Sequence, residues 1–368
     1  MNKIIYLDAA ASSLKPKAVI DAQADFLRNS YANTGRGVCA RAAAADKMLA
    51  DAREYVARFI GADSANQVVF TSGTTDGMNR IVNIVCDSRD IKTIAVSDID
   101  HHSARMPWEH IARRGNAKFV KIPLTKNYDL DYANVPTADV IVITAMSNVL
   151  GVAQDVRAVV AAARKKNPNV ITVVDAAQYV AHAPIDVRAW DCDFMCFSGH
   201  KIGADTGVGV MYIKNPDDFS PDKFGGGMVK NISGDNWNID SAPNKFEAGT
   251  LPLTQIAGLP VAIDAWRAWS GGADIIQYIY DELTTMPRIK LLTARDAKII
   301  SFVVRDLHVL DFGALIGAHN ICLRVGNMCA SWVHELMGVD GSVRISVGPW
   351  NTMSDAKRVV DIIRKIVG

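Results

Sequence analysis

The segment Ser198-Gly199-His200-Lys201 follows a short apolar run, Phe194–Phe197, that is typical of a buried strand. A lysine amine forms a Schiff base with an aldehyde cofactor only when the amine is accessible and partly neutral. Burial at the end of a strand lowers the pKa of a lysine and therefore favours this chemistry. Because a single lysine in a turn is usually a surface residue, this segment alone is a weak indication.

Further polar residues follow other apolar runs. Asp175 ends the run 170–175, where a carboxylate could pair with a protonated pyridine nitrogen or simply cap a helix. The segment Thr71–Asp76 could bind a phosphate through the first N–H groups of a helix, or form an ordinary capping turn. His101 could stack on a flat ring, although a single histidine is more often structural, and Asn148 could reach a ring hydroxyl.

Alternating strand-like and helix-like stretches would position these residues. Short apolar runs that end in polar residues read as buried strands over 67–71, 93–97, 118–122, 139–144 and 170–175. Helical patterns lie between them over 42–59, 76–85 and 156–166. This alternation predicts an α/β fold with a mainly parallel sheet, in which ligands bind beyond the carboxyl ends of the strands.

The pattern changes after Pro252. We expect one long helix over 254–269, strands over 299–304, 321–325 and 342–347, and a terminal helix over 354–367. This pattern favours a smaller α+β domain that begins at about residue 256.

Composition restricts the class of protein. The chain has 368 residues, with 40 Lys and Arg against 39 Asp and Glu, so it lacks the basic excess that nucleic-acid binding needs. We expect no membrane span, because no run of about 18 apolar residues occurs, and no signal peptide. Six scattered cysteines favour a reducing cytoplasm over a disulfide framework, and no His or Cys cluster predicts a metal site.

The order of these features, each after a strand, is more specific than any one of them. On that order the chain resembles the class V aminotransferase family of fold-type-I pyridoxal-phosphate (PLP) enzymes, in its cysteine desulfurase and selenocysteine lyase branch. The matching segments run nearly end to end: YLDAAASS (6–13), NTGRG (33–37), TSGTTDGMN (71–79), DIDHHSARMPW (98–108), SNVLG (147–151), VDAAQ (174–178), FSGHK (197–201), FEAGT (246–250), LRVGNMCA (323–330) and VRISVGPWNT (343–352).

The resemblance implies a domain organisation. We expect an N-terminal segment, 1–15, that packs with the small domain, a large PLP-binding domain over 16–255, and a small domain over 256–368 that carries the catalytic cysteine loop.

It also implies roles for cofactor-binding residues. Lys201 matches the Schiff-base lysine, His101 the ring-stacking histidine and Asp175 the partner of the pyridine nitrogen. Thr250 matches a residue that reaches the phosphate of the neighbouring subunit, which implies a homodimer with shared sites. The remaining matches are phosphate contacts and ring contacts: Thr74, Thr75, Ser198 and His200 for the phosphate, and Asn148 and Gln178 for the ring.

Substrate binding and the nucleophile follow from the same resemblance. Arg344 matches the arginine that grips the substrate carboxylate, and Arg324 lies at a second arginine position near that pocket. Cys329 matches the cysteine of the Arg-x-Gly-x-x-Cys-Ala loop, where a thiolate would act as nucleophile. A free cysteine is more often a small buried hydrophobe, and Cys322 fits that role better.

Three departures from the family pattern concern the surroundings of the pocket. After the early Asn33, Cys39 stands where the desulfurases usually have a histidine, so the resemblance implies a second thiol near the substrate. The small domain is short between 270 and 299, where about one more helix is usual. Ser331-Trp332 replaces a proline-containing continuation, and Asn244-Lys245 replaces an aromatic-Arg pair before FEAGT.

The expected activity is conversion of L-cysteine to L-alanine with a persulfide on Cys329, which an acceptor protein of unknown identity would receive. Selenocysteine lyase activity on L-selenocysteine uses the same residues and stays open. A second alternative is another PLP reaction on this scaffold, namely an aminotransferase, an epimerase or a C–S lyase that does not use Cys329. A third is a non-catalytic sulfur-relay subunit, which intact Lys201, Asp175 and Arg344 disfavour.

Overall fold

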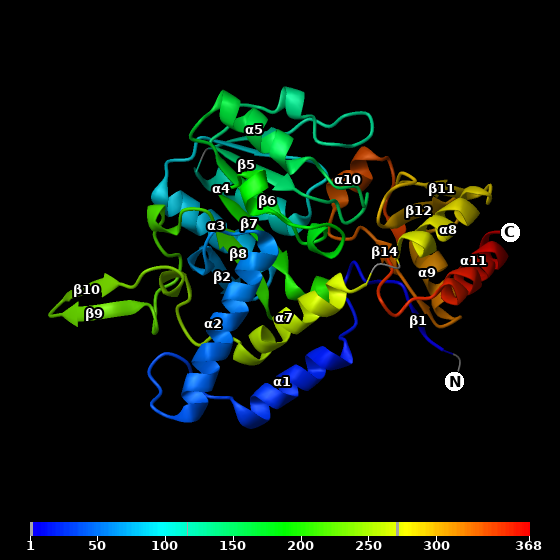
Figure 1. Ribbon diagram of the computed structural model, residues 1–368. Helices are drawn as coiled ribbons and strands as arrows, with labels where there is room; N and C mark the ends of the chain where they lie inside the picture. Colours follow the sequence, from blue (N-terminus) through cyan, green and yellow to red (C-terminus); the bar gives the residue numbers. More distant parts are fainter. Residues whose placement is uncertain (1–2, 116, 270–271) are drawn as a thin grey trace.

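The computed structural model describes residues 3–115, 117–269 and 272–368. A large central sheet, covered by helices on both faces, is joined to a smaller sheet that lies beside it with its own helices (Figure 1). The predicted α/β class with a mainly parallel sheet is confirmed. Strands β3 to β7 pair in parallel, whereas β8 pairs antiparallel with both β7 and β2.

Seven strands form the central sheet within the described residues. In spatial order they are β2 (Val68–Thr71), β8 (Gly209–Ile213), β7 (Phe194–Ser198), β6 (Ile171–Asp175), β5 (Val140–Thr144), β3 (Thr93–Val96) and β4 (Lys118–Lys121). Sequence analysis predicted β2, β3, β4, β5, β6 and β7 to within about one residue, and did not predict β8.

Alternate residues of a central strand pack on opposite faces of this sheet. In β5, Ile141 and Ile143 belong to one buried cluster, and Val140 and Val142 belong to the other. Because successive side chains of a strand point to opposite faces, a continuous apolar run is what a strand covered on both sides requires. The covering helices are α2 (Ala40–Ile60), α3 (Thr74–Ser88), α4 (His102–Gly115), α5 (Val156–Lys166), α6 (Val187–Trp190) and α7 (Leu253–Arg267), and α1 (Lys17–Asn29) packs on α7.

A buried ion pair covers the free edge of β2. Arg53 and Glu247 join through two N–O contacts of 2.7 Å, and both side chains are almost fully buried. Glu247 Oε1 also accepts from the Phe70 N–H, and Arg53 Nη1 donates to the Val68 carbonyl, at 2.7 Å each. Backbone groups of the edge strand, which would otherwise be buried without partners, are therefore satisfied by side chains.

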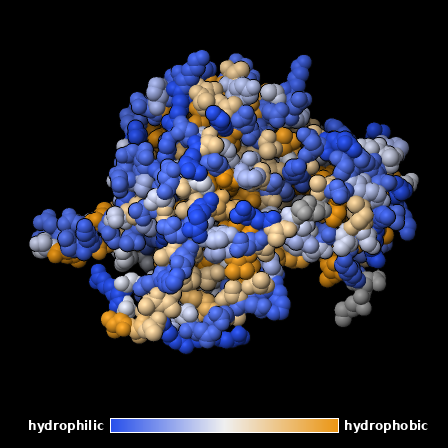
Figure 2. Space-filling view, in the orientation of Figure 1, coloured by the Kyte–Doolittle hydropathy of each residue, from blue (hydrophilic) through white to orange (hydrophobic). Residues whose placement is uncertain are grey.

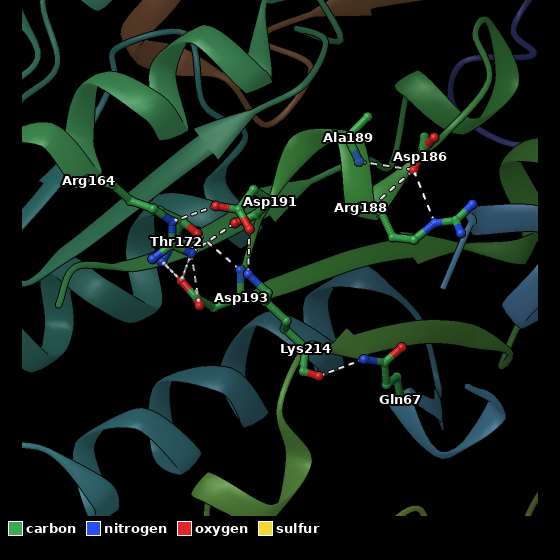
Figure 3. A network of polar contacts seen from close by, with 9 residues as sticks. All are labelled: Gln67, Arg164, Thr172, Asp186, Arg188, Ala189, Asp191, Asp193 and Lys214. Atoms are coloured by element: carbon green, nitrogen blue, oxygen red, sulfur yellow. Dashed lines mark hydrogen bonds and ion pairs between the residues drawn. The ribbon is translucent and has the colours of Figure 1, made fainter. Parts of the chain in front are cut away.

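Polar contacts tie the amino ends of β6 and β7 together (Figure 3). The Asp193 carboxylate accepts from the backbone N–H and the hydroxyl of Thr172, both at 2.8 Å, and pairs with Arg164 at 3.1 Å. Asp191 pairs with Arg164 and with Lys214, which follows β8. This network lies at the edge of the sheet opposite the carboxyl ends, so it fixes strand register away from the predicted site.

The smaller sheet has the spatial order β11 (Ile289–Leu291), β12 (Ile300–Val304), β15 (Ser342–Ile345) and β14 (Arg324–Gly326). Its helices are α8 (Gly272–Thr284), α9 (Val309–Gly317), α10 (Ser331–Leu336) and α11 (Met353–Val367). Thr352 and Asp355 form a capping box at the start of α11. The predicted helix over 354–367 therefore exists, and it starts one residue earlier.

The single strand predicted over 321–325 is wrong. Two short strands replace it: β13 (Ile321–Cys322), which pairs in parallel with β1 (Ile5–Tyr6), and β14, which pairs with β15. Ile5 and Leu7 are buried in the small-domain core, and Lys3 pairs with Asp355 of α11. Ser13, later in the same segment, bonds instead to the backbone of His200 and Lys201 in the large domain. Residues 1 and 2 of the predicted segment 1–15 lie outside the described residues.

The packing bears on the predicted boundary at residue 256. That boundary falls within α7, whose Ile256, Leu259 and Ile263 side chains pack in the large-domain core. After Ile5 and Leu7 of the N-terminal segment, the next residue of the small-domain core is Ile275, in α8. Ala330, next to Cys329, also packs in the large-domain core. The packing favours a boundary between α7 and α8, and the division into domains remains a prediction.

Most of the face seen in Figure 2 is hydrophilic, and a two-stranded arm projects from the body of the molecule. This antiparallel arm, β9 (Val229–Ser233) and β10 (Asn236–Ile239), was not predicted from the sequence. Neither face of the arm is buried, so its sequence does not need the regular alternation of apolar and polar residues by which a strand is recognised.

Candidate active site

Helix α3 begins at the carboxyl end of β2, and its first residues form a cradle with the end of β7. The Thr74 N–H donates to Ser198 Oγ at 2.7 Å, and the Thr74 and Ser198 hydroxyls are 2.8 Å apart. Gly73 precedes the helix and has a φ of 146°. The Gly73 backbone packs closely on Gly209, where an added Cβ would lie 2.5 Å from the Gly73 Cα. The first N–H groups of a helix have no partner within the helix, so this turn can bind an anion.

His101 lies between β3 and α4. Its Nδ1 accepts from the Ser103 N–H at 3.1 Å, so the neutral ring carries its proton on Nε2. Burial, and then the nearby positive charge of Lys201, lower the pKa of His101 to about 4. A neutral, flat imidazole is therefore available at physiological pH. Thr75 belongs to the same corner, because its hydroxyl lies 2.8 Å from Ser103 Oγ.

Three polar residues follow β5 and β6. Asp175 ends β6, and burial raises its pKa to about 6 even though it accepts from the Ala177 N–H at 2.8 Å. Asn148 Nδ2 donates to the Met328 carbonyl, and Gln178 Nε2 donates to the Ala10 carbonyl. The side-chain oxygens of Asn148 and Gln178 are buried and have no partner among the described residues. Buried acceptors without partners are uncommon, which suggests that they bind a ligand.

Lys201 follows β7 by three residues, in a short 3₁₀ turn. Its Nζ donates to the Ala10 carbonyl at 2.6 Å and to the Ala11 carbonyl at 3.2 Å. Burial, and then the Arg344 charge, lower the pKa of Lys201 to about 8. The amine is therefore partly neutral near physiological pH, as sequence analysis expected. His200 Nδ1, beside it, is buried without a partner among the described residues.

A cavity of about 210 Å³ collects these groups. The register explains this arrangement. Thr144 lies opposite Asp175, so β5 and β6 end level, and Asp175 lies opposite Cys196, so β7 ends two residues further on at the same edge of the sheet. Predicted residues that line the cavity are Thr74, Thr75, His101, Asn148, Asp175, Gln178, Ser198, His200 and Lys201. Ser103, Thr144, Met146 and Ala177 also line it, and sequence analysis did not name them.

Six predicted residues do not line this cavity: Arg324, Arg344 and Cys329, which are described below, and Asn33, Cys39 and Thr250. Asn33 and Cys39 are exposed in the connection between α1 and α2, and Thr250 is exposed before α7. The chain described here does not bring them to the other site residues by itself.

Arg344 is held at the centre of β15 by the N-terminal segment. Its Nη2 lies 3.0 Å from Asp8 Oδ1, and its Nη1 donates to the Asn148 carbonyl at 3.0 Å. Its Nε is buried without a partner among the described residues, so part of the guanidinium fork is available to a carboxylate. Arg324, half-exposed, also pairs with Asp8, at 3.1 Å. Sequence analysis missed this role of Asp8, although it lies in the matched segment 6–13.

Cys329 is exposed in the loop between β14 and α10. Two neighbouring residues, Met328 and Cys329, have left-handed backbone conformations, with φ of 51° and 53°. Two hydrogen bonds join the loop to the rim of the cavity. The Met328 carbonyl accepts from Asn148 Nδ2, and the Cys329 carbonyl accepts from the His102 N–H at 2.8 Å. Cys322 is also exposed, which differs from the buried role that sequence analysis gave it.

Two further observations concern the part of the chain that the structure describes. No helix in it is both long and apolar enough to cross a membrane. Over the same residues, no group of three or more His, Cys, Asp or Glu side chains is placed to hold a metal ion.

A sequence profile of class-V aminotransferases matches residues 5–359. The chain belongs to this family. It is similar to a probable cysteine desulfurase from Vibrio cholerae, with 34% identity over 100% of this chain and 94% of the relative. A cysteine desulfurase from Shigella flexneri is 33% identical over 99% of this chain and 93% of its own length.

Solved structures of the family have the same fold. The apo cysteine desulfurase of Thermococcus onnurineus NA1 superposes with a TM-score of 0.94, at 29% identity, over 100% of this chain and 95% of that chain. The cysteine desulfurase CsdA of Escherichia coli, in an S-sulfonic acid form, superposes with a TM-score of 0.90, at 31% identity, over 98% and 94%.

Proposed function

We propose that this protein is a PLP-dependent cysteine desulfurase, which converts L-cysteine to L-alanine and leaves a persulfide on Cys329. One observation carries the proposal: the Cys329 loop is bonded to the rim of a cavity that contains a partly neutral lysine and a buried aspartate. The desulfurase names of full-length relatives and of solved structures of the same fold support it.

The cavity suits pyridoxal phosphate. The turn at Gly73, Thr74 and Ser198 would hold a phosphate, and the unpartnered oxygen of Asn148 would accept from the ring hydroxyl. Asp175 would ionise fully beside a protonated ring nitrogen, because a positive charge lowers the pKa that burial has raised. His101, neutral and flat, would stack on the ring. The bound cofactor supplies an aldehyde for Lys201 and a ring that withdraws electrons from the Cα of an amino acid.

Three residues of the chain would bind the substrate, move its proton and attack its sulfur. Arg344 binds the substrate carboxylate through the part of its guanidinium group that Asp8 and Asn148 leave free. Lys201 takes a proton from the substrate Cα, for which a pKa of about 8 is well placed. The Cys329 thiolate attacks the substrate sulfur. As the S–S bond forms the Cβ–S bond breaks and its electron pair passes to Cβ, which takes up one proton. Lys201 then returns a proton to Cα, which gives alanine.

The same residues favour a homodimer with shared active sites. Asn33, Cys39 and Thr250 match family site residues yet are exposed outside the cavity of their own chain. Large hydrophobic side chains are exposed nearby, with Val38 in the α1–α2 connection and Ile232 and Trp237 on the β9–β10 arm. Figure 2 shows a few hydrophobic residues among hydrophilic ones at these two places, and burying them against a second chain would be favourable. The cysteines are free thiols, which suits a cytoplasmic enzyme that passes sulfur to an acceptor protein.

The test compares wild type with Cys329→Ala. Both proteins should bind PLP and show its absorbance band, because Cys329 does not line the cavity that would hold the cofactor. Only wild type should convert L-cysteine to alanine and reducible sulfur. Equal alanine production by both proteins would instead indicate another class V reaction that does not use Cys329.

A further inference from the structure

The Cys329 loop is attached to helix α4 by more than one bond, and the imidazole of His102 is at the centre of the attachment. Whereas the His102 backbone N–H donates to the Cys329 carbonyl, His102 Nε2 accepts from the Ser331 N–H at 3.1 Å. Ser331 is the first residue of α10, so its N–H has no partner within that helix. His102 therefore caps the helix that follows the nucleophile.

A second contact reinforces this cap. The ring of Trp332 meets the edge of the His102 ring, with centroids 5.0 Å apart and planes at 77°. Trp332 also contacts Arg105, whose guanidinium carbon lies 3.8 Å from the centroid of the Trp332 ring. His102 and Arg105 are three residues apart at the start of α4, so both point from one face of the helix. Arg105 is itself fixed by an ion pair of 2.7 Å with Asp98.

The loop needs such support. Left-handed conformations at two successive non-glycine residues, Met328 and Cys329, are strained and persist only when the surroundings impose them. The strand before the loop, β14, belongs to the small sheet, whereas Ala330 after it packs in the large-domain core. The position of the Cys329 thiol therefore depends on contacts that join the loop to the large domain.

We propose that His102, with Trp332 and Arg105, is a positioning clamp that holds the Cys329 loop against the cavity, so that the thiol is aimed at the bound substrate. The proposal rests on the desulfurase function proposed above. His102 acts through the loop and not on the substrate, because its Nε2 is occupied by Ser331. His101, which precedes His102 in the chain, lines the cavity. One peptide bond therefore separates the residue that holds the Cys329 loop from a residue of the proposed cofactor site.

Three variants of the complete holoenzyme separate the parts of the clamp. His102→Phe keeps a ring against Trp332 but removes the acceptor, whereas His102→Gln keeps an acceptor oxygen. Trp332→Leu removes the aromatic contact and leaves both His102 bonds. All three keep the backbone bond to Cys329 and every residue that lines the cavity.

Three measurements apply to each variant. Hydrogen exchange of the Ser331 amide, followed by mass spectrometry of the peptide that contains it, reports the His102 bond directly. Alanine formation from L-cysteine gives kcat and KM. The absorbance change on adding L-alanine, which has no sulfur, reports substrate binding without the nucleophile.

In His102→Phe we expect loss of Ser331 amide protection and a fall in kcat of about tenfold to a hundredfold, with KM and the L-alanine response unchanged. His102→Gln should keep Ser331 protection and most of the wild-type kcat, and Trp332→Leu should lie between the two. Wild-type kcat in His102→Phe, or equal damage in His102→Gln, would overturn the proposal. So would loss of the L-alanine response, because the defect would then lie in substrate binding. If wild type made no alanine, the desulfurase proposal would fail, and Ser331 exchange alone would decide whether the clamp exists.

Discussion

Asp8 Oδ1 lies 3.0 Å from Arg344 Nη2, so a residue near the N-terminus orients an arginine that comes 336 positions later. Asp8 also pairs with Arg324 at 3.1 Å, and it is buried. The pair joins the N-terminal segment to the small sheet beside the Asn148 carbonyl. The proposed carboxylate site therefore requires the segment that carries Asp8 to be folded in place.

Arg344→Lys tests the carboxylate site. Lysine keeps the charge but not the planar fork, so we expect KM for L-cysteine to rise about tenfold to a hundredfold, with a smaller change in kcat. Steady-state kinetics of alanine formation measure both values. Arg295→Lys is the matched control, because Arg295 forms an exposed ion pair with Asp281 outside the cavity. An unchanged KM in Arg344→Lys would contradict the assignment.

The pKa of Lys201 sets the pH dependence of cofactor capture. Only the neutral amine attacks an aldehyde, and burial lowers this pKa from 10.5 to about 8. The rate at which cofactor-free protein captures PLP should therefore rise with pH up to about 8 and then level off. Stopped-flow absorbance follows the reaction. A rate that still climbs steeply above pH 9 would indicate an ordinary, solvated lysine.

Asp175→Asn provides a second test of the same amine. The Asp175 charge raises the pKa of Lys201, so its removal should move the plateau of PLP capture to lower pH. The neutral amide cannot stabilise a protonated ring nitrogen, and we expect alanine formation to fall at least about a hundredfold. The amide oxygen can still accept from the Ala177 N–H, so the thermal unfolding temperature should change little. Full activity in Asp175→Asn would rule out the proposed pairing.

The cavity residues could be predicted from the sequence because each follows a strand, and parallel strands bring their carboxyl ends to one edge. Asp175 and Lys201 were found in this way. The contacts of Asp8 with Arg344 and of His102 with Trp332 could not be predicted, because each joins segments more than 200 residues apart and local spacing carries no sign of the pairing.

Other differences have a similar physical origin. The apolar run 321–325 looks like one strand, but Leu323 is where the chain passes from β13 to β14, and tertiary pairing decides that change. Thr250 was found by its motif and Cys39 by its departure from one, yet a single chain leaves both exposed. Their predicted roles need surfaces that one chain does not contain.

Glu247→Gln tests the support of the edge strand β2. The substitution leaves Arg53 buried without its counter-charge, and we expect a loss of about 3–5 kcal/mol in the free energy of unfolding, measured in urea. Asp51→Asn breaks the exposed Lys47–Asp51 pair and should cost less than about 1 kcal/mol. Similar effects of the two substitutions would contradict the role of the buried pair.

The most direct test of the central claim is to locate the transferred sulfur. Wild type, Cys329→Ser and the matched control Cys322→Ser, which removes another exposed thiol, would each react with L-cysteine without reductant. Mass spectrometry of the peptides then identifies any cysteine that has gained one sulfur atom. We predict a persulfide on Cys329 in wild type and in Cys322→Ser, with one alanine for each sulfur, and neither product in Cys329→Ser. Persulfide on Cys322 or Cys39, or alanine from Cys329→Ser at the wild-type rate, would show that Cys329 is not the nucleophile.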